Sequence, residues 1–99
     1  MLTSKQRAYL RGLANGLEPI LHMGKGGLSD AMIQQADDAL TAREIIKGKA
    51  LETAPVSARE TAEAIAEAVG AEVVQVVGRT FVLYRRNEKE PKIQLPKQR

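Results

Sequence analysis

The spacing of apolar residues changes repeatedly along the chain, and this alternation limits the possible folds more than any other feature. Apolar side chains at helical spacing predict helices over residues 4–14, 29–43 and 58–69. Short runs rich in Ile and Val predict strands over residues 20–23, 44–51, 72–77 and 80–85. Strands that alternate with helices pair in parallel through crossovers, whereas the last two strands, linked by only two residues, form an antiparallel hairpin. The sequence therefore predicts an α/β fold, a two-layer sandwich in the order α-β-α-β-α-β-β with a mixed four-stranded sheet.

Local signals define the ends of the helices and of the domain. Thr3 with Gln6, and Ser57 with Glu60, have the spacing of a capping box, and Ser29 is a good N-cap for the second helix. The length suits one domain, which we expect over residues 1–86. Residues 87–99 are polar, basic and contain two prolines, so we expect a loose C-terminal tail.

Composition excludes several classes of protein. Cysteine is absent, which rules out disulfides, a thiolate nucleophile and any Cys-based metal site. The N-terminus has no apolar signal-like run, and no later stretch is apolar for long enough to cross a membrane. We therefore expect a soluble cytoplasmic protein with no membrane partner.

Charge is distributed unevenly along the chain. Residues 1–29 carry a net charge of +3, residues 30–74 a net −5, and residues 75–99 a net +5. If the two basic ends meet in the fold, they would form a polarised surface able to bind a polyanion. The alternative is that these charged residues lie on separate, solvent-exposed faces and bind no partner.

The loop Gly24-Lys25-Gly26-Gly27 joins the first strand to the second helix. The first N–H groups of a helix have no partner within it, and that end carries partial positive charge, so it can accept a phosphate. Glycines let a phosphate approach the main chain closely, and Lys25 adds a cation at the tip. The alternative is a tight turn that needs positive φ angles and contacts no ligand.

The sequence pattern of this loop limits which phosphate-containing ligands it could bind. GxxxxGK[ST] is missing, so it is not a P-loop, and the three glycines do not fit the GxGxxG dinucleotide fingerprint. The remaining known use is the GXXG loop of KH-type modules, which clamps RNA backbone.

Five segments, in this order, carry a resemblance to a known family: LTSKQRAYLRGLA, LHMGKGGLSDAM, REIIKGK, VQVVGRTFVLYRR and KIQLP. The chain resembles the CRM domain (chloroplast RNA splicing and ribosome maturation) and its stand-alone bacterial form, the YhbY family. The resemblance implies a fold like the C-terminal domain of translation initiation factor three, with sheet order 1-2-4-3 and residues 80–85 in an internal strand. It also implies binding to ribosomal RNA in precursors of the large subunit through Gly24, Lys25, Gly26 and Gly27. Gly48 departs from the family, which usually has a branched residue there, and this puts the regularity of that strand in question.

Basic residues outside the loop should extend the contact with RNA, since each neutralised phosphate releases counterions. The candidates are Lys5, Arg11, Arg79, Arg85 and Arg86. Aromatic residues are few, and Phe81 and Tyr84 should point to opposite faces of their strand, so recognition should depend on backbone and shape rather than on base stacking.

We find no candidate catalytic or metal-binding constellation. His22 is the only histidine and has no obvious partner, and the adjacent Asp37 and Asp38 diverge around a helix, as expected of a solvated face. The prediction is therefore a non-catalytic protein with no cofactor and no small-molecule substrate, whose partner is RNA. Two alternatives remain open: a small phosphate-ligand enzyme that uses the same loop, and a protein-interaction adaptor.

Overall fold

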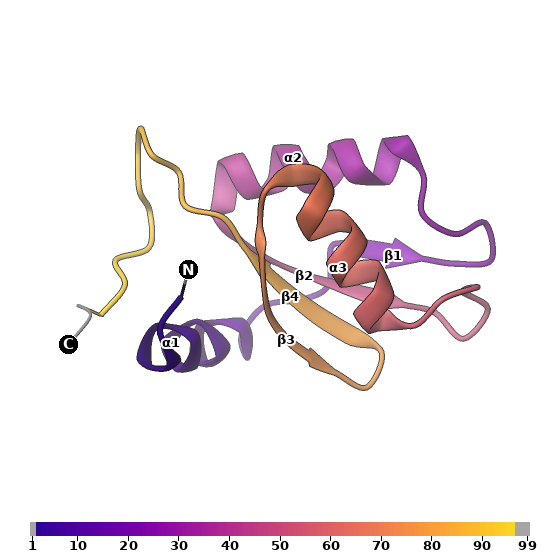
Figure 1. Cartoon of the computed structure of the whole chain (residues 1–99), viewed down its shortest axis with the longest axis horizontal. Coiled ribbons are helices and arrows are strands. Elements are labelled where there is room, and N and C mark those ends of the chain that lie inside the picture. Colours follow the sequence, from indigo (N-terminus) through magenta and orange to yellow (C-terminus); the bar gives the residue numbers. More distant parts are fainter. Residues whose placement is uncertain (1, 97–99) are drawn as a thin grey trace.

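The computed structural model describes residues 2–96 and contains the seven predicted elements in the predicted order (Figure 1). They are α1 (Ser4–Ala14), β1 (Leu21–Met23), α2 (Asp30–Arg43), β2 (Ile45–Ala50), α3 (Ala58–Val69), β3 (Glu72–Val77) and β4 (Thr80–Tyr84). Each boundary lies within one residue of its sequence-based position. The last three residues of the chain, 97–99, which belong to the predicted tail, lie outside the described part.

The predicted helix caps are present. The Gln6 backbone N–H donates to Thr3 Oγ1 at 3.1 Å, and Gln6 Oε1 accepts from the Thr3 N–H at 3.1 Å. Ser57 and Glu60 form the same reciprocal pair at the start of α3. Side chains named by local spacing thus satisfy N–H groups that the helices leave free.

The sheet has the order β1-β2-β4-β3, as the family resemblance implied. β1 pairs with β2 in parallel, and the other two pairings are antiparallel. β4 is internal, and all four of its residues from Phe81 to Tyr84 are buried. The expectation that Phe81 and Tyr84 face opposite sides is confirmed, because they belong to different core clusters.

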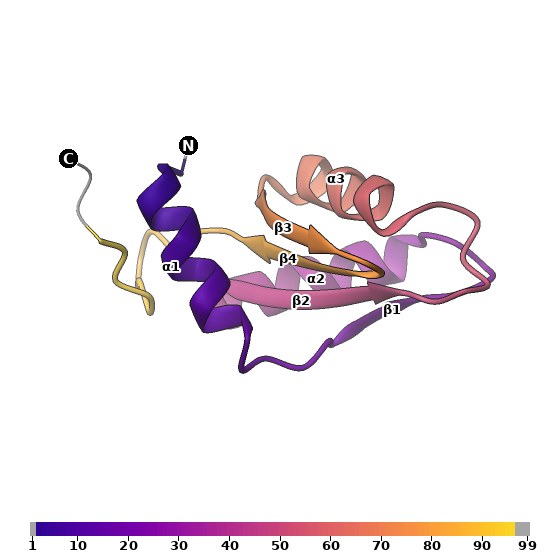
Figure 2. The same cartoon turned by 90° about the horizontal axis from the view of Figure 1, so that it is seen from below.

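The two faces of the sheet are covered unequally. α2 and α3 pack side by side on one face and bury the larger core, which includes Ile46 and Phe81. α1 packs on the other face through Leu10 and Ala14, toward one end only (Figures 1 and 2). Ile93 and Leu95 also pack on this second face, whereas His22 and Lys49 on it are exposed. We call the part around His22, Lys47 and Lys49 the open face of the sheet.

Gly48 does not interrupt β2, which runs unbroken from Ile45 to Ala50. Gly48 lies opposite Phe81 of β4, and the Phe81 ring occupies the space that a side chain would fill. A Cβ atom at position 48 would lie 2.3 Å from Phe81 Cζ. A ring packed against bare backbone therefore gives glycine a structural role at position 48.

The expectation of a loose C-terminal tail was wrong for residues 87–96, which are held against the domain. The buried carboxylate of Glu44, which follows α2, accepts hydrogen bonds at 2.6 Å from the backbone N–H groups of Asn87, Lys92 and Ile93. Ile93 and Leu95 pack against the core cluster that α1 covers. The tail is held because one buried carboxylate accepts hydrogen bonds from three backbone N–H groups that are distant from it in sequence.

The carboxyl group of Glu44 should make the folding stability of the protein depend on pH. Burial alone would raise the pKa of Glu44, but three backbone N–H donors and the charge of Arg86 act against it and bring the pKa below its usual value. Because the pKa of Glu44 is lower in the folded than in the unfolded protein, its ionised carboxylate stabilises the fold. This stabilisation is complete above the unfolded-state pKa of about 4.3, and it is lost as the pH falls through the folded-state pKa.

We expect Glu44→Gln to lower the free energy of unfolding by about 1–2 kcal/mol at pH 7, since it removes charge-assisted hydrogen bonds. Urea denaturation between pH 3 and pH 7 measures this difference, which should shrink as the pH falls. Glu90→Gln, at an exposed tail position, is the matched control and should change little. Equal effects of the two substitutions at pH 7 would contradict the assignment.

Candidate nucleic-acid interface

The GKGG loop forms a β-turn between β1 and α2. The Gly27 N–H donates to the Gly24 carbonyl at 3.0 Å, which places Lys25 and Gly26 at the corners of the turn. Both corner residues are exposed. Ser29 then caps α2 by accepting from the Met32 N–H at 3.2 Å. An exposed cation therefore lies a few residues before a helix N-terminus, the arrangement that can hold a phosphate group.

The turn itself requires only one of its glycines. Gly27 has φ +76°, where a side chain would be strained, and a Cβ there would lie 3.3 Å from Pro55 Cγ. At Gly26 the backbone is ordinary, and an added Cβ would meet no atom within 4 Å. Internal packing thus accounts for Gly27 but leaves Gly26 without a structural requirement.

Two other connections lie at the same end of the molecule as the GKGG loop (Figures 1 and 2). One is the β2–α3 connection, whose Leu51 donates its N–H to the Met23 carbonyl at 2.8 Å. The other is the β3–β4 hairpin, where the Arg79 carbonyl accepts from the Ala50 N–H at 2.8 Å. We call these three connections the loop end. Of the predicted basic residues, Arg79 is the one that shares it with Lys25.

The remaining candidates lie toward the opposite end. Lys5 and Arg11 are exposed on α1, and Arg85 and Arg86 follow β4 (Figure 1). The molecule extends 42 Å along its longest axis, on which these two ends lie. The structure therefore does not gather all the predicted cations into one cluster with the loop.

Arg85 is committed to intramolecular contacts. Its guanidinium donates to the Asp37 carboxylate at 2.6 Å, the Val69 carbonyl at 2.8 Å and Thr41 Oγ1 at 2.8 Å. It thereby ties the C-terminal parts of α2 and α3 to the end of β4. Asp37, expected on a solvated face with Asp38, is half-buried as the partner in this clasp.

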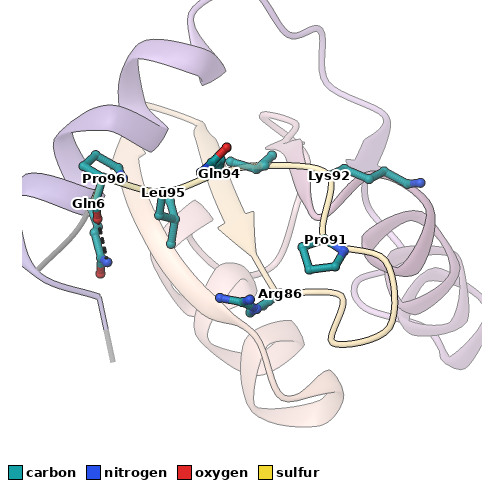
Figure 3. Close-up of a pocket in the computed structure, with 8 residues that line it drawn as sticks. Gln6, Arg86, Pro91, Lys92, Gln94, Leu95 and Pro96 are labelled. Carbon is teal, nitrogen blue, oxygen red and sulfur yellow. Dashed lines mark hydrogen bonds between the residues drawn. The ribbon is translucent and has the colours of Figure 1, made fainter.

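A pocket of about 460 Å³ lies between α1 and the tail at this far end (Figure 3). The Gln6 side chain donates to the Pro96 carbonyl at 3.1 Å across one side of it. Arg86 and Lys92 also line the pocket, and Arg86 pairs with Glu88 at 3.8 Å. Arg86 is thus exposed but distant from the loop end.

The sequence analysis overlooked two lysines on the open face of the sheet. In β2, Lys47 and Lys49 alternate with core residues and so point away from α2 and α3. His22 of β1 is the register neighbour of Lys49, and both are exposed. In the segment IIKGKA the lysines occupy every second position, which indicates that they share one face of the strand. Which face of the sheet is exposed could not be identified without the position of α1.

Within residues 2–96, no group of three or more His, Asp or Glu side chains could hold a metal ion. In the same range, no helix combines the length and the apolar character needed to cross a membrane.

Comparison with known proteins places the chain in a family. The CRS1/YhbY (CRM) domain model matches residues 2–85. The chain is 42% identical over 96 residues to the probable RNA-binding protein YqeI of Bacillus subtilis, with 97% of this chain and all of that protein covered. It is 38% identical over 100 residues to an RNA-binding protein of Haemophilus influenzae, with 97% and 96% of the two chains covered. The solution structure of Staphylococcus aureus SAV1595 is similar at a TM-score of 0.80 and 45% identity, covering 97% and 100% of the chains. This chain is therefore a member of the CRS1/YhbY (CRM) domain family.

Proposed function

We propose that this protein binds ribosomal RNA in precursors of the large ribosomal subunit, in the cytoplasm, and assists their assembly without catalysing a reaction. In this proposal residues 1–86 are the RNA-binding domain, and the GKGG loop with the start of α2 grips the RNA backbone. The relatives named RNA-binding proteins support the class of ligand.

The observation that carries the proposal is the exposed corner of the GKGG turn. Gly26 has open space around its Cα and no internal requirement for glycine, while Lys25 beside it is exposed. A residue without a side chain next to a cation is what close contact with a phosphodiester requires. A turn that contacts no ligand would need glycine at Gly27 alone.

Nearby cations define the expected path of the RNA. Arg79 lies at the loop end, and Lys49 and Lys47 continue from there across the open face of the sheet, with the imidazole of His22 beside Lys49 as a further polar contact. Lys5, Arg11 and Arg86 lie toward the opposite end and would contact only RNA that extends along the molecule. Arg85 is a structural residue in this account because both of its terminal NH2 groups already donate to α2 and α3.

The salt dependence of binding tests this proposal. Lys25, Arg79, Lys47 and Lys49 would contact about four phosphates, and each contributes about −0.7 to −0.9 to the slope of log affinity against log salt concentration. We therefore expect fluorescence-anisotropy titrations with structured fragments of large-subunit ribosomal RNA to give a slope near −3. Free nucleotides and inorganic phosphate should not compete at millimolar concentration, whereas effective competition by them would favour the small-ligand enzyme. Failure to bind any of the RNA fragments at low salt would favour the protein adaptor.

The ribosomal assignment needs a separate measurement in cells. The tagged protein should sediment in sucrose gradients with precursors of the large subunit, and ribonuclease treatment should release it. Sedimentation with free RNA or with small-subunit particles alone would contradict the assignment to the large subunit while leaving RNA binding intact.

A further inference from the structure

A cavity of about 400 Å³ lies at the loop end, between the β2–α3 connection and the β3–β4 hairpin. Leu51, Ala54 and Val56 supply apolar lining, and Glu52 and Arg79 supply charged groups. Its volume falls within the range of small-ligand sites.

The cavity adjoins the GKGG loop directly. A Cβ on Gly24 would lie 3.6 Å from Leu51 Cδ1, and one on Gly27 would lie 3.3 Å from Pro55 Cγ. A polymer whose backbone is held at Lys25 and Gly26 would therefore pass within reach of the cavity. Leu51 lines the cavity and also lies beside Gly24 of the loop.

Apolar side chains are unusually exposed around this cavity. Among the described residues, five large hydrophobic side chains are exposed, and three of them are here: Leu51 at 39%, Val56 at 40% and Val77, next to the lining residue Gly78, at 60%. The other two, Tyr9 and Leu13, lie on α1. Apolar surface gathered beside a cationic loop indicates a partner that is both anionic and partly apolar, rather than a phosphate alone.

The charged groups of the cavity distinguish a base from a phosphate. Arg79 pairs with Glu52 at 3.4 Å, and both side chains are exposed. A carboxylate repels phosphate but accepts hydrogen bonds from the exocyclic amino group of a base. A guanidinium plane can stack on a base, and Leu51 and Val56 offer an apolar surface nearby.

We propose that this cavity binds the base of an unpaired RNA nucleotide adjoining the backbone segment held by the GKGG loop. The inference rests on the proposed RNA-binding function and adds a preference to it. RNA with a bulged or looped-out nucleotide binds better than a continuous duplex. A base bearing an amino group is favoured because Glu52 can accept from it.

Two hairpin RNAs, each closed by the same non-nucleotide linker so that neither has unpaired loop bases, differ only by one bulged nucleotide and test the inference. The bulge carries 2-aminopurine, whose fluorescence reports its surroundings, and affinity is measured by competition against a labelled RNA. We expect the wild-type protein to prefer the bulged hairpin about tenfold, in line with the measured worth of one base contact. The fluorescence of the bulged base should change on binding.

The variant Leu51→Ser/Val56→Ser should lose this preference and the fluorescence change while keeping its affinity for the paired hairpin and its salt slope. Both residues are exposed, so the fold should persist, which circular dichroism checks. Tyr9→Ser/Leu13→Ser, the other exposed apolar pair, should behave as wild type. Equal wild-type binding of the two hairpins, or an unchanged preference in Leu51→Ser/Val56→Ser, would overturn the inference. Failure to bind either hairpin would instead contradict the proposed function on which it rests.

Discussion

Gly48→Val should lower the free energy of unfolding by about 3–5 kcal/mol, the range seen when a buried aromatic side chain loses its packing. A Cβ at position 48 would lie 2.3, 2.6 and 3.0 Å from three atoms of the Phe81 ring. That ring is only 1% exposed and lies in the main core, so it has no free volume to enter. The valine can be accommodated only by displacing Phe81 or by opening β2 from β4, and urea denaturation measures the loss.

Two further variants separate this cause from a general effect of valine. Lys49→Val changes the neighbouring exposed position in the same strand and should alter stability by less than about 1 kcal/mol. Phe81→Leu, combined with Gly48→Val, should recover a substantial part of the loss because the smaller side chain vacates the contested space. Strictly additive effects of the two substitutions would contradict a direct clash between position 48 and the ring.

The elements of the fold could be predicted because their signals are local. Capping boxes at Thr3–Gln6 and Ser57–Glu60, and the change from helical to strand spacing, lie within a few residues of one another. The order of the strands did not follow from these patterns and came from the family resemblance. The partner of Gly48 could not be predicted either, because it depends on the register between β2 and β4.

The ordered tail could not be predicted for a similar reason. The bonds from Glu44 to the backbone of Asn87, Lys92 and Ile93 join positions 43 to 49 residues apart. In the sequence, Glu44 is one of nine acidic residues in the central segment, and nothing local marks it as buried.

The candidate interface was predicted in part. The GKGG loop was evident because glycine and lysine have specific physical uses, and the structure leaves Lys25 and Gly26 exposed. The surrounding cations were chosen by charge alone, which does not reveal direction. Arg85 is partly buried and bonded to α2 and α3. Lys47 and Lys49 were overlooked, although they lie on the open face of the sheet.

Reversing the charge of the loop is expected to have the largest effect on RNA binding. Lys25→Asp/Gly26→Asp should weaken affinity at least about 30-fold, which corresponds to about 2 kcal/mol. The double substitution removes the cation, adds two carboxylates that repel phosphate, and fills the space through which the backbone would be approached. The fold should be retained, because a Cβ at Gly26 meets no atom within 4 Å and both positions are exposed.

A tail variant with the same change in net charge provides the matched control. Lys89→Asp/Gln94→Asp also lowers the net charge by three, at exposed positions of the tail far from the loop end. If affinity follows overall charge, the two variants should lose it equally. If it depends on the loop, only the loop variant should lose it.

The most direct test is therefore one anisotropy titration of a large-subunit ribosomal RNA fragment with three proteins: wild type, Lys25→Asp/Gly26→Asp and Lys89→Asp/Gln94→Asp. Circular dichroism confirms that each is folded. We predict tight, salt-dependent binding by wild type and by the tail variant, and loss of binding by the loop variant. Equal affinity of the wild type and the loop variant would contradict the account and reduce the GKGG loop to a turn.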